Sequence, residues 1–226
     1  MLLEFKTKNY KSFVDEMSFI MSPAPKQKGL DYSVQTTKIG AKNYKSLCSA
    51  VVYGPNASGK TNIIGAIDTM KSIIMRGNIR NADVPMSMNA ASSLLELIPN
   101  CDSNSAPVEF SIRFIENDML IDYSMIVDLG GFLEKDHSRK ILEEKLAVNE
   151  KPVFIRNDKL EVSIPSCIKP YLNSNIKSVI VRYAPPLLCC IQHITRSARS
   201  IILRLRTWIA DLGCASDDSA HTSTSS

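Results

Sequence analysis

The residues with the clearest chemical potential form one short run, Gly54-Pro55-Asn56-Ala57-Ser58-Gly59-Lys60-Thr61. The run satisfies the pattern G-x-x-x-x-G-K-[ST] of a phosphate-binding loop, or P-loop. Glycines at both ends let the backbone turn tightly, so that successive N–H groups can surround an anion. Lys60 is expected to contact the β- and γ-phosphates, and the Thr61 hydroxyl to complete part of a Mg2+ shell. The run predicts a site for ATP, or another nucleoside triphosphate, with Mg2+.

The elements that must position this loop are also visible in the sequence. Residues 47–53 form a short apolar run that predicts a buried strand leading into the loop. Behind the loop, apolar residues recur at steps of three and four and predict a helix that begins near Lys60. The N-terminus of that helix adds partial positive charge at the phosphates. A glycine-rich turn without a ligand is the alternative, and the contiguous strand, loop and helix favour the phosphate site. The apolar positions of the helix are Ile63, Ile64, Ile67, Met70, Ile73 and Ile74, and Gly77 stands at its expected C-terminal cap.

Alternating apolar and polar residues predict antiparallel strands elsewhere. Residues 2–21 are expected to form two strands beside the strand at 47–53, and a polar loop is expected to follow to about Ser46. Residues 107–164 are expected to form a separate antiparallel sheet. The predicted fold class is α/β with α+β character: a P-loop lobe with an antiparallel β subdomain. The strands expected in the second sheet are 108–114, 119–127, 141–148, 153–156 and 160–164.

Composition and charge narrow the class of protein. Hydrophobic residues make up 44% and charged residues 22%, which is ordinary for a soluble globular chain. No run approaches the ~18 apolar residues of a membrane span, and the N-terminus lacks a secretory signal, so a cytoplasmic location is expected. The six cysteines include no CxxC pair and are expected to be reduced thiols. The net charge of +4 comes entirely from residues 162–226, since residues 1–161 hold 20 basic and 20 acidic side chains. It therefore gives no support for DNA binding by the P-loop region.

Two motifs carry a resemblance to a known family. Gly54–Asn62 resembles the GPNxSGKxN loop of ABC-type ATPases, and within them the branch of SMC, RecF and OLD-like proteins, many of which carry the AAA name and act in phage defence. Asn9-Tyr10-Lys11-Ser12-Phe13 resembles the NF(K/R)SF segment of that branch, which approaches the nucleotide. The β-rich residues 107–164 are similar to the insert that follows the P-loop helix there. The resemblance covers residues 1 to about 164 and implies the N-terminal lobe of an ABC-type ATPase head.

The resemblance also implies residues and partners. Asn9, Lys11 and Ser12 become further nucleotide contacts, beside the loop residues Gly54 to Asn62. Two such lobes sandwich ATP in a homodimer of the full-length protein, and the choice between a nuclease partner and DNA is left open by the sequence. Hydrolysis in the family needs a Mg2+-binding aspartate, a following glutamate and a Ser-Gly-Gly signature. Asp122, Asp211 and residues 129–131 do not fit these patterns, so no catalytic residue is assigned and the head is predicted to be incomplete.

The end of the chain, residues 165–226, differs from the rest. It holds no acid before Asp211, four of the six cysteines, and a Ser/Thr-rich terminus at 215–226 that is expected to be disordered. Residues 203–209 could form a basic amphipathic helix for a membrane surface or an acidic partner. A truncation or a reading-frame shift near residues 182–192 would also produce this break in composition.

Two functions follow from these observations, and both are kept. The first is the ATP-hydrolysis lobe of an SMC/RecF/OLD-like machine, incomplete for catalysis in this chain. The second is a regulatory or interaction module that binds nucleotide without hydrolysing it. A P-loop kinase is a third and weaker option, because no lid arginine or substrate loop supports it. Arg76, Arg80 and His137 are interpreted as solvated charges rather than as site residues.

Overall fold

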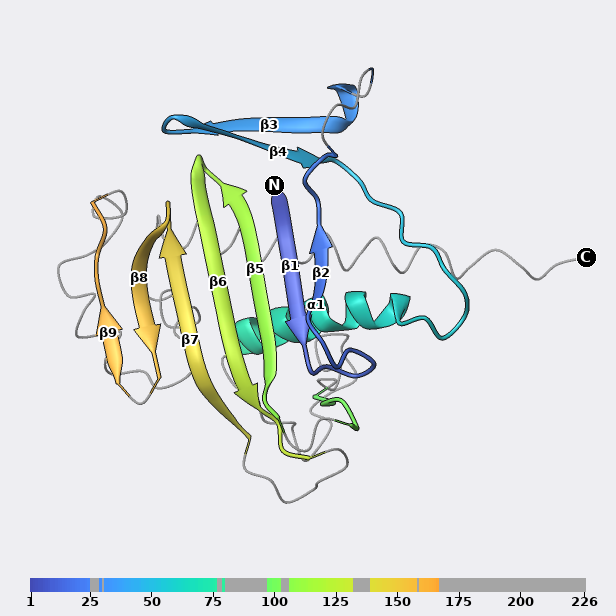
Figure 1. Ribbon diagram of the computed structural model, residues 1–226. Helices are drawn as coiled ribbons and strands as arrows, with labels where there is room; N and C mark the ends of the chain where they lie inside the picture. The colour runs from blue at the N-terminus through green and yellow to red at the C-terminus, as the bar shows by residue number, and fades with distance from the viewer. Residues whose placement is uncertain are drawn as a thin grey trace, which may run out of the picture.

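A seven-stranded antiparallel sheet dominates the computed structural model, which describes residues 1–24, 29, 31–76, 79, 97–102, 106–131, 139–157 and 159–166 (Figure 1). The strand order is β2-β1-β5-β6-β7-β8-β9, and every neighbouring pair is antiparallel. The strands are β1 (Leu2–Lys8), β2 (Met17–Ile20), β5 (Val108–Glu116), β6 (Met119–Asp128), β7 (Lys140–Val148), β8 (Lys151–Arg156) and β9 (Leu160–Val162).

Tight turns join the central strands of this sheet. Asn117 and Asp118 connect β5 to β6 with φ angles of 49° and 57°, and Asn149 and Glu150 connect β7 to β8 with 51° and 64°. Two successive residues with positive φ suit the right-handed twist of a hairpin, and Asn and Asp tolerate that conformation. The Asn149 side chain also accepts a hydrogen bond from the backbone N–H of Leu120 at 2.9 Å, which ties this turn to β6.

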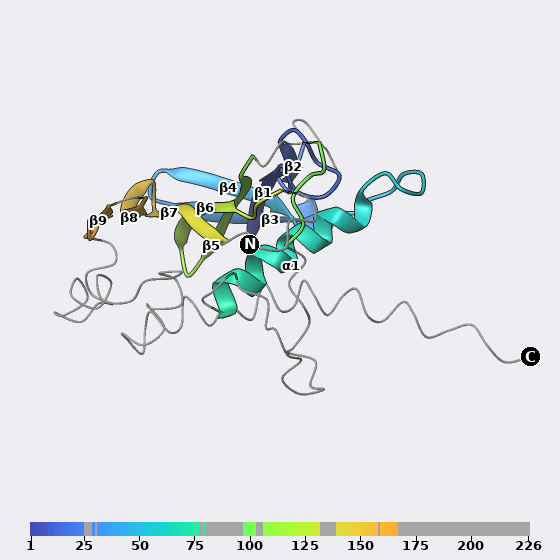
Figure 2. The ribbon, with the colours of Figure 1, turned by 90° about the horizontal axis from the view of Figure 1, so that it is seen from below.

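Helix α1 (Lys60–Arg76) packs on one face of the sheet. It crosses β1, β5 and β6, as the two ribbon views show (Figures 1 and 2). Ala66, Met70 and Ile73 of the helix are buried in the same core cluster as Phe5, Phe110 and Tyr123 of the strands. This layer of helix on sheet buries the C-terminal half of the predicted apolar stripe, Met70, Ile73 and Ile74, whereas Ile64 is 52% exposed.

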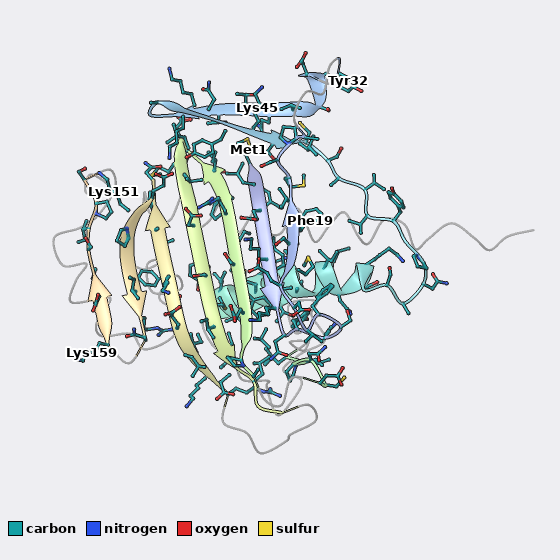
Figure 3. The ribbon with its side chains drawn as sticks, in the orientation of Figure 1. Met1, Phe19, Tyr32, Lys45, Lys151 and Lys159 are labelled. Atoms are coloured by element: carbon teal, nitrogen blue, oxygen red, sulfur yellow. The ribbon has the colours of Figure 1, made fainter. Side chains whose placement is uncertain are left out.

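A second, two-stranded sheet lies at the end of the first. Strands β3 (Val34–Ile39) and β4 (Lys42–Leu47) follow a short 3-10 helix, η1 (Asp31–Ser33). Ile39 and Tyr44 of this hairpin pack with Met1 on a small cluster of Leu3, Ile115 and Leu120, while Lys45 is on its exposed side (Figure 3). The hairpin corrects the expectation of a polar loop up to Ser46. Its strands are rich in Lys and Thr and lack a clear apolar alternation, so the pattern that predicts a strand is weak.

Two other expectations about the sheet are wrong. Residues 107–164 do not form a separate sheet, because β5 pairs with β1 and joins both groups of strands. Strand β1 is largely buried, and such a strand needs partners on both edges, β2 on one and β5 on the other. The expected strand at 47–53 is absent as well: β4 ends at Leu47, and residues 48–53 belong to neither described sheet. The expected strands near 2–21, 108–127 and 141–164 are confirmed.

The predicted fold class is confirmed at the level of its secondary-structure content. The described residues are mostly β-sheet with one α-helix, which is consistent with a P-loop NTPase-like domain of α+β character. The expected cap at Gly77 and the expected basic helix at 203–209 lie outside the described residues. None of the described helices is both long enough and apolar enough to cross a membrane.

Candidate nucleotide-binding site

The loop between residue 54 and helix α1 has the backbone of an anion cradle. Ala57 and Gly59 both have positive φ, 63° and 84°, and the N–H of Ser58 donates back to the carbonyl of Pro55 at 3.4 Å. The chain then enters α1 at Lys60, where the N–H of Asn62 donates to the carbonyl of Gly59 at 3.0 Å. Alternation of left-handed and right-handed residues points successive N–H groups to one side, and the helix N-terminus adds partial positive charge there.

The Lys60 side chain folds back over this loop. Its ammonium group donates to the carbonyls of Gly54 at 2.9 Å and Pro55 at 2.7 Å, and it lies 3.4 Å from Oγ of Ser58. A full positive charge therefore lies over the same residues whose N–H groups form the cradle. This arrangement favours an anion with several oxygen atoms, such as a polyphosphate.

Thr61 is the second residue of α1, and its side chain is exposed beside Lys60. A hydroxyl at this place is a suitable oxygen ligand for Mg2+, a cation that usually retains several water ligands. Thr61 would therefore be one protein ligand of the predicted metal.

The turn at residues 9–13 packs against the start of α1. Tyr10 and Phe13 exchange backbone hydrogen bonds of 3.0 and 2.9 Å, which close the turn. The hydroxyl of Tyr10 is buried and lies 3.0 Å from Oγ1 of Thr69 on α1. Ser12 accepts a hydrogen bond from the side-chain amide of Asn62 at 2.7 Å. The turn and the phosphate loop, which are 40 residues or more apart in sequence, are thus direct neighbours.

The three predicted contacts of this turn have different surroundings. The Asn9 side chain is buried, and its amide donates to the carbonyls of Ala106 and, at 3.3 Å, Pro107. Asn9 thus connects β1 to the start of β5 and does not face the loop. The Lys11 ammonium lies 5.6 Å from the centre of the Tyr10 ring, and Ser12 is exposed beside Asn62. Tyr10 and Thr69 anchor the turn, and the sequence analysis predicts neither as part of the site. Tyr10 lies inside the segment 9–13 that resembles the family motif, whereas no local sequence pattern marks Thr69.

The acids considered for Mg2+ lie away from the loop or outside the described residues. Asp122 is in the middle of β6 and pairs with Arg113 of β5. Its neighbours Ile121 and Tyr123 face the α1 side of the sheet, so Asp122 faces the opposite side. Asp128 accepts a hydrogen bond from the N–H of Gly130 at 3.1 Å, which makes residues 129–131 part of a turn after β6. Asp211 lies outside the described residues, as do Arg80 and His137. Within the described part, no group of three or more His, Cys, Asp or Glu residues could hold a metal.

The fold and the loop together are consistent with a P-loop NTPase-like domain. Residues 49–163 match the model of the family described as "AAA domain, putative AbiEii toxin, Type IV TA system", and the chain belongs to this family. The match begins in the segment before the phosphate loop and ends after β9, so it includes the loop, α1 and five strands of the large sheet. Membership indicates a nucleotide-binding domain of ATPase type. No curated protein matches the chain.

Proposed function

We propose that this protein binds ATP with Mg2+ through Gly54–Thr61 and forms the nucleotide-binding lobe of an ATPase of the SMC/RecF/OLD-like type. The observation that carries the proposal is the position of the Lys60 ammonium, 2.7–2.9 Å from two carbonyls of the loop. Its charge and the N-terminus of α1 act on the same loop, and both favour a triphosphate. The Thr61 hydroxyl would hold Mg2+, and the bound cation would neutralise phosphate charge.

Each residue near the loop has a proposed role. The backbone of Gly54 to Gly59 surrounds the phosphates, Lys60 contacts them directly, and Asn62 orients the start of the helix. Lys11 would add a second cation from the turn at 9–13. Asn9 acts through the backbone, because its side chain is buried against residues 106–107.

A second function, nucleotide binding without hydrolysis, is supported by the position of Asp122. This acid is paired with Arg113 on the face of the sheet opposite α1, so it does not serve Mg2+ at Thr61. A chain of this kind would act as a nucleotide-dependent regulatory or interaction module. If a partner lobe supplies acids, the protein belongs instead to a DNA-repair or phage-defence machine that dimerises around ATP and acts with a nuclease or on DNA.

Equilibrium binding of Mg-ATP tests the first proposal. Lys60→Ala removes a charge-assisted contact of about 1.5–3 kcal/mol, so its affinity should fall ~10–150-fold. Lys71→Ala is the matched control, since it removes the same charge from the same helix, where Lys71 lies 3.6 Å from Asp68. Unchanged affinity in Lys60→Ala, or an equal loss in both variants, would show that the loop is not the site. Steady-state ATP turnover by the wild-type chain then separates an ATPase from a binding module.

A further inference from the structure

The position of the phosphate loop raises the question of what holds it against the sheet. Residues 48–53 are mostly apolar but join no strand among the described residues, and the N–H of Cys48 donates to the carbonyl of Ser33 at 2.9 Å. This segment runs outside the large sheet in both ribbon views (Figures 1 and 2). The loop is therefore fixed from its other end, where α1 begins.

One side-chain pair connects the two parts at that end. Asn62, the third residue of α1, uses its backbone N–H to bind the carbonyl of Gly59 and its side-chain amide to bind Oγ of Ser12 at 2.7 Å. The same residue thus contacts the last turn of the loop and the turn at residues 9–13. A hydrogen bond of this length with a neutral amide donor is well formed.

Packing at Gly59 adds a steric connection. A Cβ atom on Gly59 would lie 2.9 Å from Oγ of Ser12 and 3.4 Å from the Phe13 ring, so the loop and the turn are in close contact at this glycine. Gly59 also has a φ of 84°, which few other residues adopt. Ser12 therefore lies directly against Gly59, a residue of the phosphate loop.

The turn itself is fixed to the core of the protein. Tyr10 is fully buried and its hydroxyl is hydrogen-bonded to Thr69, and Asn100 also holds the turn. The Asn100 amide donates to the carbonyl of Lys11 at 2.6 Å, its N–H donates to the carbonyl of Asn9 at 3.1 Å, and the N–H of Lys11 donates to Ile98 at 3.2 Å. The turn is thus a fixed point against which a neighbouring loop can be aligned.

We infer that Ser12 and Asn62 form a positioning pair, whose hydrogen bond aligns the phosphate loop on the turn at residues 9–13 and so sets nucleotide affinity. Both residues act through Gly59 and the backbone of the loop rather than as separate ligand contacts. The inference rests on the proposed function, because the quantity that the pair controls is the affinity for Mg-ATP.

A double-mutant cycle measured with Mg-ATP tests the pair. Ser12→Ala and Asn62→Ala should each lower affinity about three- to tenfold, the effect of one hydrogen bond, and the double variant should lose no more than the weaker-binding single variant. Ser12→Thr retains the hydroxyl and should retain affinity. Ser18→Ala, a matched change on β2 away from the loop, should leave affinity unchanged. If Asn62→Ala does not fold, Asn62→Leu replaces it, since leucine keeps the volume and lacks the amide.

The outcomes separate this inference from the proposed function. Losses that add in the double variant would identify two independent nucleotide contacts and overturn the pair, as would full affinity in either single variant. A loss in Ser12→Thr equal to that in Ser12→Ala would overturn the role of the hydroxyl. If the wild-type chain does not bind Mg-ATP, the proposed function fails and the pair fails with it. Suppose that the wild-type chain binds Mg-ATP, that Lys60→Ala loses this binding, and that the losses in the double-mutant cycle are additive. The proposed function then stands and only the inferred pair is overturned.

Discussion

Strand β5 and the segment 48–53 contain similar residue types in opposite surroundings. Both are rich in β-branched and aromatic side chains, yet Val108 and Phe110 of β5 are 0% and 1% exposed, whereas Val51 and Tyr53 are 85% and 91% exposed. Strand β5 has a partner on each edge, and residues 48–53 have none among the described strands. Residue preference favours an extended backbone in both regions, but only paired strands bury their side chains.

This difference changes how the site is held. In the sheet, ladders of backbone hydrogen bonds and a shared core fix the positions of the strands. The phosphate loop is held instead by the first turns of α1 and by the turn at residues 9–13. The side chains that connect these parts are Tyr10, Thr69, Ser12 and Asn62. The two regions should therefore respond differently to the same kind of substitution.

The largest contrast is expected between two aromatic truncations. Phe110→Ala removes a buried ring and should lower the free energy of unfolding by about 3–5 kcal/mol. Tyr53→Ala removes an exposed ring and should change it by no more than about 0.5 kcal/mol. Chemical denaturation of both variants measures these changes in the free energy of unfolding. Equal losses would mean that the segment before the loop is buried in the folded protein.

A second contrast concerns the polar cluster inside the sheet. The hydroxyl of Tyr123 donates to the buried carboxylate of Glu144 at 2.6 Å, and Arg156 lies 2.7 Å from the other carboxylate oxygen. Burial, followed by the charge of Glu144 and this hydrogen bond, raises the pKa of Tyr123 well above its usual value. The unfolded chain releases that proton near pH 10 and the folded chain does not.

The direction of the pH effect follows from this raised pKa. The contribution of Tyr123 to stability is complete below about pH 10 and is lost as the pH rises above it, by up to about 1.4 kcal/mol per pH unit. A comparison of the unfolding free energy of the wild-type chain and of Tyr123→Phe between pH 8 and 11 checks this loss of stability. The variant should lose less stability over this range, and an equal loss in both chains would contradict the raised pKa.

The smallest expected effect is in the loop itself. Ala57 has a φ of 63°, a conformation that costs an L-residue about 1–2 kcal/mol and glycine much less. Glycine also has more conformational freedom in the unfolded chain, which offsets part of this gain in stability. Ala57→Gly should therefore stabilise the folded loop by about 1 kcal/mol or less. Thermal unfolding in the presence and absence of Mg-ATP measures the gain. A clear loss of stability would show that Ala57 does not occupy this backbone region.

Local patterns account for most of the elements. The alternation in residues 108–127 and 141–162 predicted β5 to β9, and apolar steps of three and four predicted α1, because these periods reflect which side chains face the core. The pairing of β1 with β5 was not predictable, since contacts between distant strands leave no local period. The hairpin β3–β4 was missed because its Lys- and Thr-rich strands are mostly exposed.

The sequence indicates the chemistry of the proposed site but not the contacts that support it. Lys60 and Thr61 follow from the spacing of the loop. The burial of Asn9 does not, because a polar residue in a turn-like segment gives no sign that its amide will face the backbone of residues 106–107. Nor does the sequence show that residues 48–53 lack a partner, since a strand and an unpaired extended segment share the same residue preferences.

Amide hydrogen exchange tests the central claim most directly, with the wild-type chain measured in the presence and absence of Mg-ATP. We predict slower exchange in peptides from residues 54–62 and 9–13 when Mg-ATP is added, no change in residues 48–53 or in β7 and β8, and no protection at all in Lys60→Ala. This pattern would show that nucleotide binds at the loop and that the turn shares its stabilisation. Exchange at residues 54–62 that is unaffected by Mg-ATP, or equally slowed in Lys60→Ala, would contradict the account.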